Sequence, residues 1–123
     1  MSIQGVASAS ATERFRQRFA TLDSSHFRLL HDLWASSIGL GTYLGDPDDR
    51  TDALYAEAIG VALAHGCNVL DTAINYRCQR SERTIGRTVA TLIQERQISR
   101  DEVILCTKGG YLPFDNDTPA DPK

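Results

Sequence analysis

Short apolar runs alternate with longer amphipathic segments along most of the chain, and this alternation limits the fold more than any other feature. The apolar runs cover residues 36–43, 67–73 and 102–108, and the longer segments between them cover residues 52–65 and 81–97. Strands that alternate with helices of this length predict βαβ units and a parallel sheet. The runs are continuously apolar, which is typical of strands buried on both faces. Both a doubly wound sheet and a barrel fit this pattern.

Each of the two longer segments is predicted to be a helix that buries one face. In the first helix, residues at helical spacing share a face, which is formed by Leu54, Ala58, Val61, Ala62 and His65. Gly66 follows directly and predicts the end of this helix. In the second helix the inner face is formed by Ile85, Val89, Leu92 and Ile93. Ser81 is the predicted N-cap of the second helix.

A further helix is predicted near the N-terminus, ahead of the alternating part. Ser10 and Glu13 have the spacing of a capping box at a helix start. Phe15, Phe19 and Leu22 then recur at helical spacing. The segment that follows has no helical period, and we expect a small hairpin there.

Two charged residues close two of the apolar runs. Asp71 follows "NVL" and Lys108 follows "VILCT". In parallel sheets, ligands gather at the C-terminal ends of the strands, and neighbouring strand ends lie close together. A charge is costly to bury there without a partner, so we expect Asp71 and Lys108 to pair. Tyr76 lies on the loop just after Asp71, and a phenol beside an ammonium group becomes a better proton donor to a carbonyl oxygen.

The motifs around these residues make the interpretation more specific. The stretches "IGLGTY", "AIGVALAHGCNVLDTAINY", "SERTIGRTV" and "EVILCTKGG" occur in this order over roughly residues 27–112. As an ordered set they resemble the N-terminal part of the aldo-keto reductase superfamily. The resemblance implies an α/β fold, namely the N-terminal portion of a (β/α)8 TIM barrel. About three strands and two connecting helices would belong to the barrel, behind an N-terminal helix and a hairpin that closes the barrel bottom.

The resemblance also implies roles for individual residues. Asp71, Tyr76 and Lys108 match three members of the family's catalytic tetrad. Tyr76 would donate a proton to a small-molecule carbonyl substrate, with NADPH as the hydride source, and Lys108 paired with Asp71 would tune the tyrosine. Cofactor contacts would come from the matching turn after the first strand and from the tetrad aspartate, that is from Gly41, Thr42, Tyr43 and Asp71.

The chain also departs from the family pattern. The fourth tetrad member is a histidine expected beyond Lys108, but the histidines of this chain, His26, His31 and His65, all precede Asp71. A complete barrel needs about 250 residues, and this chain has 123. We therefore expect residues 1–35 to form the helix and hairpin and residues 36–123 an incomplete barrel. Such a chain would be inactive alone and would expose an open sheet through which it could self-associate.

Composition excludes several other classes of protein. The net charge is −3, so we expect no binding to nucleic acid or anionic membrane. The three cysteines lack CxxC spacing, which indicates neither a disulfide framework nor a metal site. A cytoplasmic location is the resulting expectation. Two alternatives to a reductase stay open: a non-catalytic truncated barrel that serves binding or association, and, with less support, a barrel aldolase in which Lys108 forms a Schiff base.

Overall fold

The computed structural model describes residues 2–116 and has an α/β architecture. Within this range the helices are α1 (Ala9–Gln17), α2 (Asp49–Ala64), α3 (Arg80–Gln94) and the 3-10 helix η1 (Arg100–Glu102). The strands of the same range are β1 (Phe27–Leu30), β2 (Leu33–Ser36), β3 (Gly39–Gly41), β4 (Val69–Asp71) and β5 (Ile104–Cys106). No helix of this range is long and apolar enough to span a membrane.

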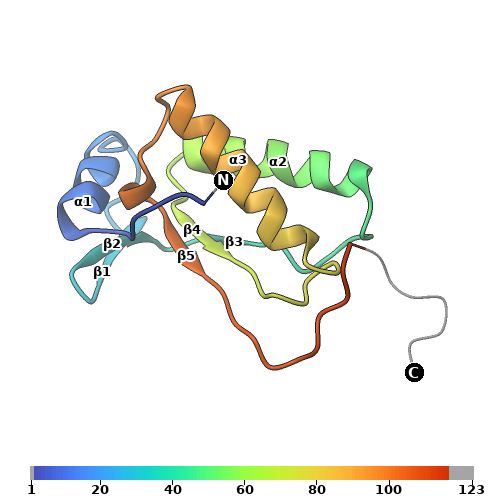
Figure 1. Cartoon of the computed structure of the whole chain (residues 1–123). Helices are drawn as coiled ribbons and strands as arrows, with labels where there is room; N and C mark the ends of the chain where they lie inside the picture. Colours follow the sequence, from blue (N-terminus) through green and yellow to red (C-terminus); the bar gives the residue numbers. More distant parts are fainter. Residues whose placement is uncertain (1, 117–123) are drawn as a thin grey trace.

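The central element is a parallel three-stranded sheet with the order β3-β4-β5. Its last register positions place Gly41 beside Asp71 and Asp71 beside Cys106. Helices α2 and α3 lie together over one face of this sheet. Helix α1 and the β1–β2 hairpin lie beyond the N-terminal ends of its strands (Figure 1). The predicted α/β class, the three parallel strands and the two connecting helices are confirmed, and the strands of the described residues do not close a barrel.

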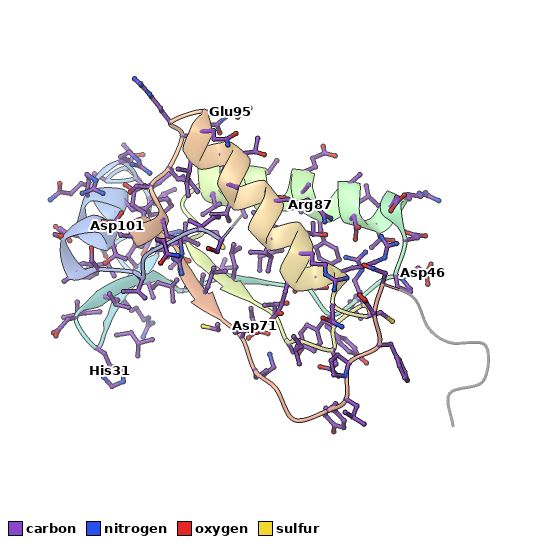
Figure 2. All side chains as sticks on the ribbon, viewed as in Figure 1. His31, Asp46, Asp71, Arg87, Glu95 and Asp101 are labelled. Carbon is purple, nitrogen blue, oxygen red and sulfur yellow. The ribbon has the colours of Figure 1, made fainter. Side chains whose placement is uncertain are left out.

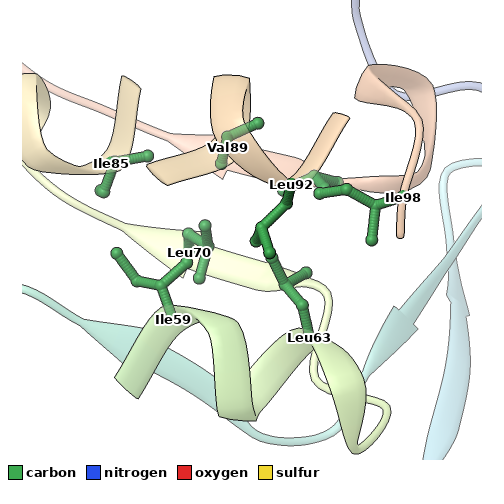
Figure 3. Close-up of a cluster of buried hydrophobic side chains, with 8 residues drawn as sticks. Ile59, Leu63, Leu70, Ile85, Val89, Leu92 and Ile98 are labelled. Atoms are coloured by element: carbon green, nitrogen blue, oxygen red, sulfur yellow. The ribbon is translucent and has the colours of Figure 1, made fainter. Parts of the chain in front are cut away.

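The main hydrophobic core lies between the sheet and the two helices. Leu70 of β4 is fully buried and points between α2 and α3, as Figure 3 shows. The core residues that surround it are Ile59, Leu63, Ile85, Val89, Leu92, Ile98 and Val103. The inner face predicted for α3 is confirmed, because Ile93 also packs against this cluster from its edge. Since successive strand residues alternate between faces, Asp71 and its register neighbours face away from the helices.

The inner face predicted for α2 is wrong. Leu54 and Val61 are 56% and 55% exposed, whereas Ile59 and Leu63 are buried. Residues of α2 are apolar around most of the helix, so the spacing of apolar residues alone does not select the buried side. Contact with Leu70 and α3 selects it instead.

Two of the predicted helix caps are also wrong. Helix α1 begins earlier than expected, because Ser8 rather than Ser10 is its N-cap and accepts a hydrogen bond from the backbone N–H of Ala11. The N-cap of α3 is Gln79, and Ser81 is buried and donates to the carbonyl oxygen of Thr42 at 2.6 Å. The hydroxyl of Ser81 therefore links α3 to the turn after β3 instead of capping its own helix.

The expected hairpin is present between β1 and β2, which pair antiparallel. Its two-residue turn consists of His31 and Asp32, which have φ values of 44° and 61°. Two-residue hairpin turns with positive φ at both positions match the right-handed twist of the strands, although Asn-Gly is the commoner sequence. The hairpin is joined to the sheet by Asn68, whose side-chain amide donates to the carbonyl oxygens of Trp34 and Glu102.

Candidate active site

Asp71 and Lys108 meet at the C-terminal ends of β4 and β5. The Lys108 ammonium nitrogen lies 2.9 Å from Oδ2 and 3.1 Å from Oδ1 of Asp71, and it also donates to the carbonyl oxygen of Thr72 at 2.9 Å. Backbone pairing continues past the strands, since the N–H of Ile74 donates to the carbonyl oxygen of Lys108. The predicted pairing of Asp71 with Lys108 is confirmed, and both side chains remain about half exposed.

Tyr76 reaches the same place from the loop after β4. The Lys108 ammonium nitrogen lies 4.7 Å from the centroid of the Tyr76 ring. The ring of Tyr43, from the turn after β3, packs against Tyr76 edge to face at a centroid distance of 5.0 Å. Loops that follow all three parallel strands therefore converge, with an ammonium group and two phenols as neighbours.

The charge distribution keeps Lys108 protonated. The pKa of Lys108 is raised above its ordinary value, mainly by the hydrogen bonds to the Asp71 carboxylate and next by the Tyr76 hydroxyl. An ammonium group in this position favours a negative charge on a neighbouring oxygen. The arrangement can therefore stabilise a phenolate after a proton has left a tyrosine.

The turn after β3 differs from residue to residue in what it offers a ligand. Thr42 is buried, and its hydroxyl donates to the carbonyl oxygen of Asp71 at 3.0 Å. Gly41 is open on its outer side, because a Cβ added there would meet no atom within 4 Å. Tyr43 is 66% exposed. The side chain of Thr42 thus fixes the backbone of Asp71, while Gly41 and Tyr43 present exposed surface beside it.

Arg77 is a site residue that the sequence analysis did not identify. Its side chain is 1% exposed and forms an ion pair with Asp52 of α2. The same guanidinium donates to the carbonyl oxygens of Asp46 and Asp48, in the loop that leads into α2. Arginines at positions 77, 80, 83 and 87 resemble the exposed face of a helix in sequence, and no local pattern distinguishes the buried one.

The histidines of the described residues lie away from these side chains. Figure 2 shows His31 at the tip of the hairpin, far from Asp71. The Nε2 atom of His26 lies 2.9 Å from the carbonyl oxygen of Gly66, and the Nδ1 atom of His65 lies 2.8 Å from that of Val61. In residues 2–116 no cluster of three or more histidine, cysteine, aspartate or glutamate residues has the geometry to hold a metal ion.

These features define an α/β protein in which a lysine–aspartate ion pair and two tyrosine rings meet at the C-terminal ends of parallel strands. The family model of the aldo/keto reductase family matches residues 37–123, so the chain belongs to the aldo/keto reductase family. The family prediction is confirmed, although the match begins after the hairpin rather than at about residue 27. No solved structure matches the chain.

Proposed function

We propose that this chain supplies the proton-donating side of an NADPH-dependent carbonyl reductase site. Family membership supports oxidoreductase chemistry. The observation that carries the proposal is the ion pair of Lys108 with Asp71, with the Lys108 ammonium 4.7 Å from the Tyr76 ring centroid. In this proposal the chain forms the N-terminal portion of a (β/α)8 barrel, in which active sites lie at the C-terminal ends of the strands.

Each of the three side chains has one task in the proposed reaction. NADPH, when bound, supplies the hydride that reduces the carbonyl carbon. Tyr76 donates its hydroxyl proton to the carbonyl oxygen of the substrate, which leaves a phenolate. The Lys108 ammonium stabilises that phenolate, and the Asp71 carboxylate holds the ammonium in place and charged.

The described residues leave space for a flat cofactor ring beside Gly41. The outer side of Gly41 has no atom within 4 Å of the position of an added Cβ, so the strand end beside Asp71 is not covered. Tyr43 next to it is mostly exposed and offers an aromatic face. Thr42 would act indirectly in this arrangement, because its hydroxyl is already bonded to the carbonyl oxygen of Asp71.

The aldolase alternative is opposed by the charge state of Lys108. A Schiff-base lysine must lose its proton before it attacks a carbonyl carbon. Here the Asp71 carboxylate raises the pKa of Lys108 and holds the ammonium form. This contact favours a role in proton transfer over a role as nucleophile.

The test is Tyr76→Phe in a chimera in which residues 37–116 replace the corresponding segment of an active family member. The change keeps the ring and removes the proton, so turnover should fall by about 10²–10⁴-fold while NADPH affinity stays the same. Tyr111→Phe is the matched control, because the same substitution is made there at a tyrosine that is 77% exposed. Equal loss of NADPH absorbance with time in the Tyr76→Phe chimera and its parent would reject the proposal.

A second candidate function, association of two copies of the chain, rests on the open sheet. Strand β5 is an edge strand within the described residues, and the sheet face opposite α2 and α3 carries half-buried Val69 and Ile104. Edge strands with unpaired backbone groups tend to pair with another chain. Sedimentation velocity over a range of concentrations should show dimers that Ile104→Lys reduces and that Leu54→Lys, on the exposed side of α2, leaves unchanged. A monomer at all concentrations would exclude this function.

A further inference from the structure

The backbone directly after Tyr76 adopts an unusual conformation. Arg77, Cys78 and Gln79 have φ values of 48°, 54° and 70°, and none of them is glycine. Residues with a Cβ are strained in this left-handed region, and they rarely follow one another in it. Such a turn persists only where contacts outside it hold it in place.

The side chain of Arg77 ties this turn to α2 and the loop before it, while the N–H of Asn116 donates to the carbonyl oxygen of Cys78 and the Gln79 amide donates to that of Phe114 on its other side. The Nε of Arg77 donates to the carbonyl oxygen of Asp46 at 2.9 Å, and its Nη2 donates to the carbonyl oxygen of Asp48 at 3.3 Å. Nη2 also lies 2.5 Å from Oδ1 of Asp52. Figure 2 shows Asp46 beside the N-terminal end of α2. A single buried guanidinium therefore ties the turn after Tyr76 to the loop before α2 and to the first turn of α2.

The two loops that Arg77 joins also carry the two aromatic rings of the site. Tyr43 lies near the start of the loop after β3, and Tyr76 lies within the loop between β4 and α3. Their rings lie 5.0 Å apart. Tyr55 adds a second link, because its hydroxyl donates to the carbonyl oxygen of Leu44 and its ring centroid lies 5.1 Å from the Arg77 guanidinium carbon. Movement of Arg77 would therefore change the spacing of both rings.

We infer that Arg77 is a positioning residue that holds Tyr76 over Lys108 by clamping the turn after Tyr76 to the loop before α2. A planar guanidinium suits this task because its donors point in several fixed directions, which a lysine ammonium cannot reproduce. The buried Nη1 of Arg77 has no hydrogen-bond partner in the described part of the chain, and the nearby Tyr55 ring gives that side of the cation a favourable neighbour. The inference rests on the proposed function, since it assigns Arg77 to the proton donor named there.

The test measures ring geometry in the 123-residue chain itself, so it does not depend on turnover. In protein labelled with ¹³C-tyrosine and ¹³C-lysine, Arg77→Met should lose the nuclear Overhauser effect between the Tyr43 and Tyr76 rings. The pKa of Lys108, followed through its ¹³Cε signal, should move down towards its ordinary value because the Tyr76 hydroxyl has moved away. Arg80→Met is the matched control, since Arg80 binds the same Asp52 carboxylate but lies within α3. The control should keep both signals.

A second variant keeps the inference falsifiable if Arg77→Met does not fold. Arg77→Gly relieves the positive φ and removes the clamp, so it should fold and still lose the signal between the rings. Retention of that signal in Arg77→Gly would overturn the inference, because the remaining contacts of the turn, made by Cys78 and Gln79, would then be enough to hold Tyr76.

The inference and the proposed function fail in different ways. In the chimera, Arg77→Gly should lower turnover about 100-fold with little change in the KM for NADPH. If Arg77→Gly moves the rings but Tyr76→Phe leaves turnover unchanged, the positioning role of Arg77 stands and the proposed role of Tyr76 is wrong.

Discussion

Asn68 and Asp71 lie at opposite ends of β4, and their surroundings differ. Asn68 is fully buried, and its side chain donates to two carbonyl oxygens and accepts from the backbone N–H of Ser36. Asp71 is about half exposed and bonds an equally exposed lysine. The first end has its polar groups satisfied within the protein, whereas the second presents charges to the outside.

Strand β5 repeats this difference. Glu102, just before it, is 1% exposed and binds the guanidinium groups of Arg14 of α1 and of Arg18, which directly follows α1. Lys108, just after it, is 51% exposed. In barrels built from parallel strands, the N-terminal ends contribute stability and the C-terminal ends carry the chemistry. In this chain the buried, satisfied polar groups lie at the N-terminal ends of β4 and β5, and the exposed charges lie at their C-terminal ends.

The largest effect on stability is expected from Asn68→Leu. The change leaves the carbonyl oxygens of Trp34 and Glu102 and the N–H of Ser36 without partners in a buried place. The free energy of unfolding should fall by about 3 kcal/mol or more. Asn75→Leu is the matched control at the other end, and it should cost less than about 0.5 kcal/mol. Equal losses in urea unfolding followed by circular dichroism would break the comparison.

The buried ion pair of Arg77 with Asp52 is an exception among the groups near the C-terminal ends of the strands. Its contribution to stability should be lost in acid. Burial alone would raise the pKa of Asp52, but hydrogen bonds from Arg77 and Arg80 outweigh burial and lower it. The ionised carboxylate therefore stabilises the fold above about pH 4, the unfolded value, and this contribution is lost as the pH falls through the lower folded pKa.

Asp52→Asn tests this exception. It should cost about 2 kcal/mol at neutral pH, because Arg77 loses its charged partner. The difference from the unmodified chain should shrink as the pH falls below the folded pKa. Asp49→Asn is the control, since Asp49 is 99% exposed. A difference that stays constant in unfolding curves from neutral to acidic pH would contradict this assignment.

Two glycines provide a smaller test of the same comparison. Gly66, near the N-terminal end of β4, has φ +92°, and an added Cβ would lie 3.2 Å from side-chain atoms of Leu22 and Phe19. Gly66→Ala should therefore lower the free energy of unfolding by about 1 kcal/mol. Gly41→Ala should change stability by less than about 0.5 kcal/mol, because the space there is open. It should weaken NADPH binding instead, as cofactor titration of the chimera would reveal. The reverse order of stability losses would contradict the comparison.

The smallest effect on stability is expected from Lys108→Met. Exposed ion pairs contribute little to stability, so the melting temperature at neutral pH should not change measurably. Because the pKa of Lys108 is raised, any stabilisation is present below about pH 10.4, the unfolded value. It is lost as the pH rises through the folded pKa. A large drop in melting temperature at neutral pH would show that the site end also supports the fold.

The local pattern of residues was enough to predict the parallel sheet, the buried face of α3 and the meeting of Asp71 with Lys108. Strand and helix periods depend on neighbours in sequence, and parallel strands bring their C-terminal ends to one edge. Helix α3 has one clearly apolar face, so its orientation followed directly. The ordered motifs also identified the family.

The face of α2, the task of Ser81 and the burial of Arg77 were decided only in three dimensions. Helix α2 is apolar on several sides, so contact with Leu70 and α3 selected Ile59 and Leu63. The hydroxyl of Ser81 and the guanidinium of Arg77 bond groups 39 and 25–31 residues away along the chain. Such contacts have no period and no local signal, because a buried polar group is satisfied by whatever the fold brings next to it.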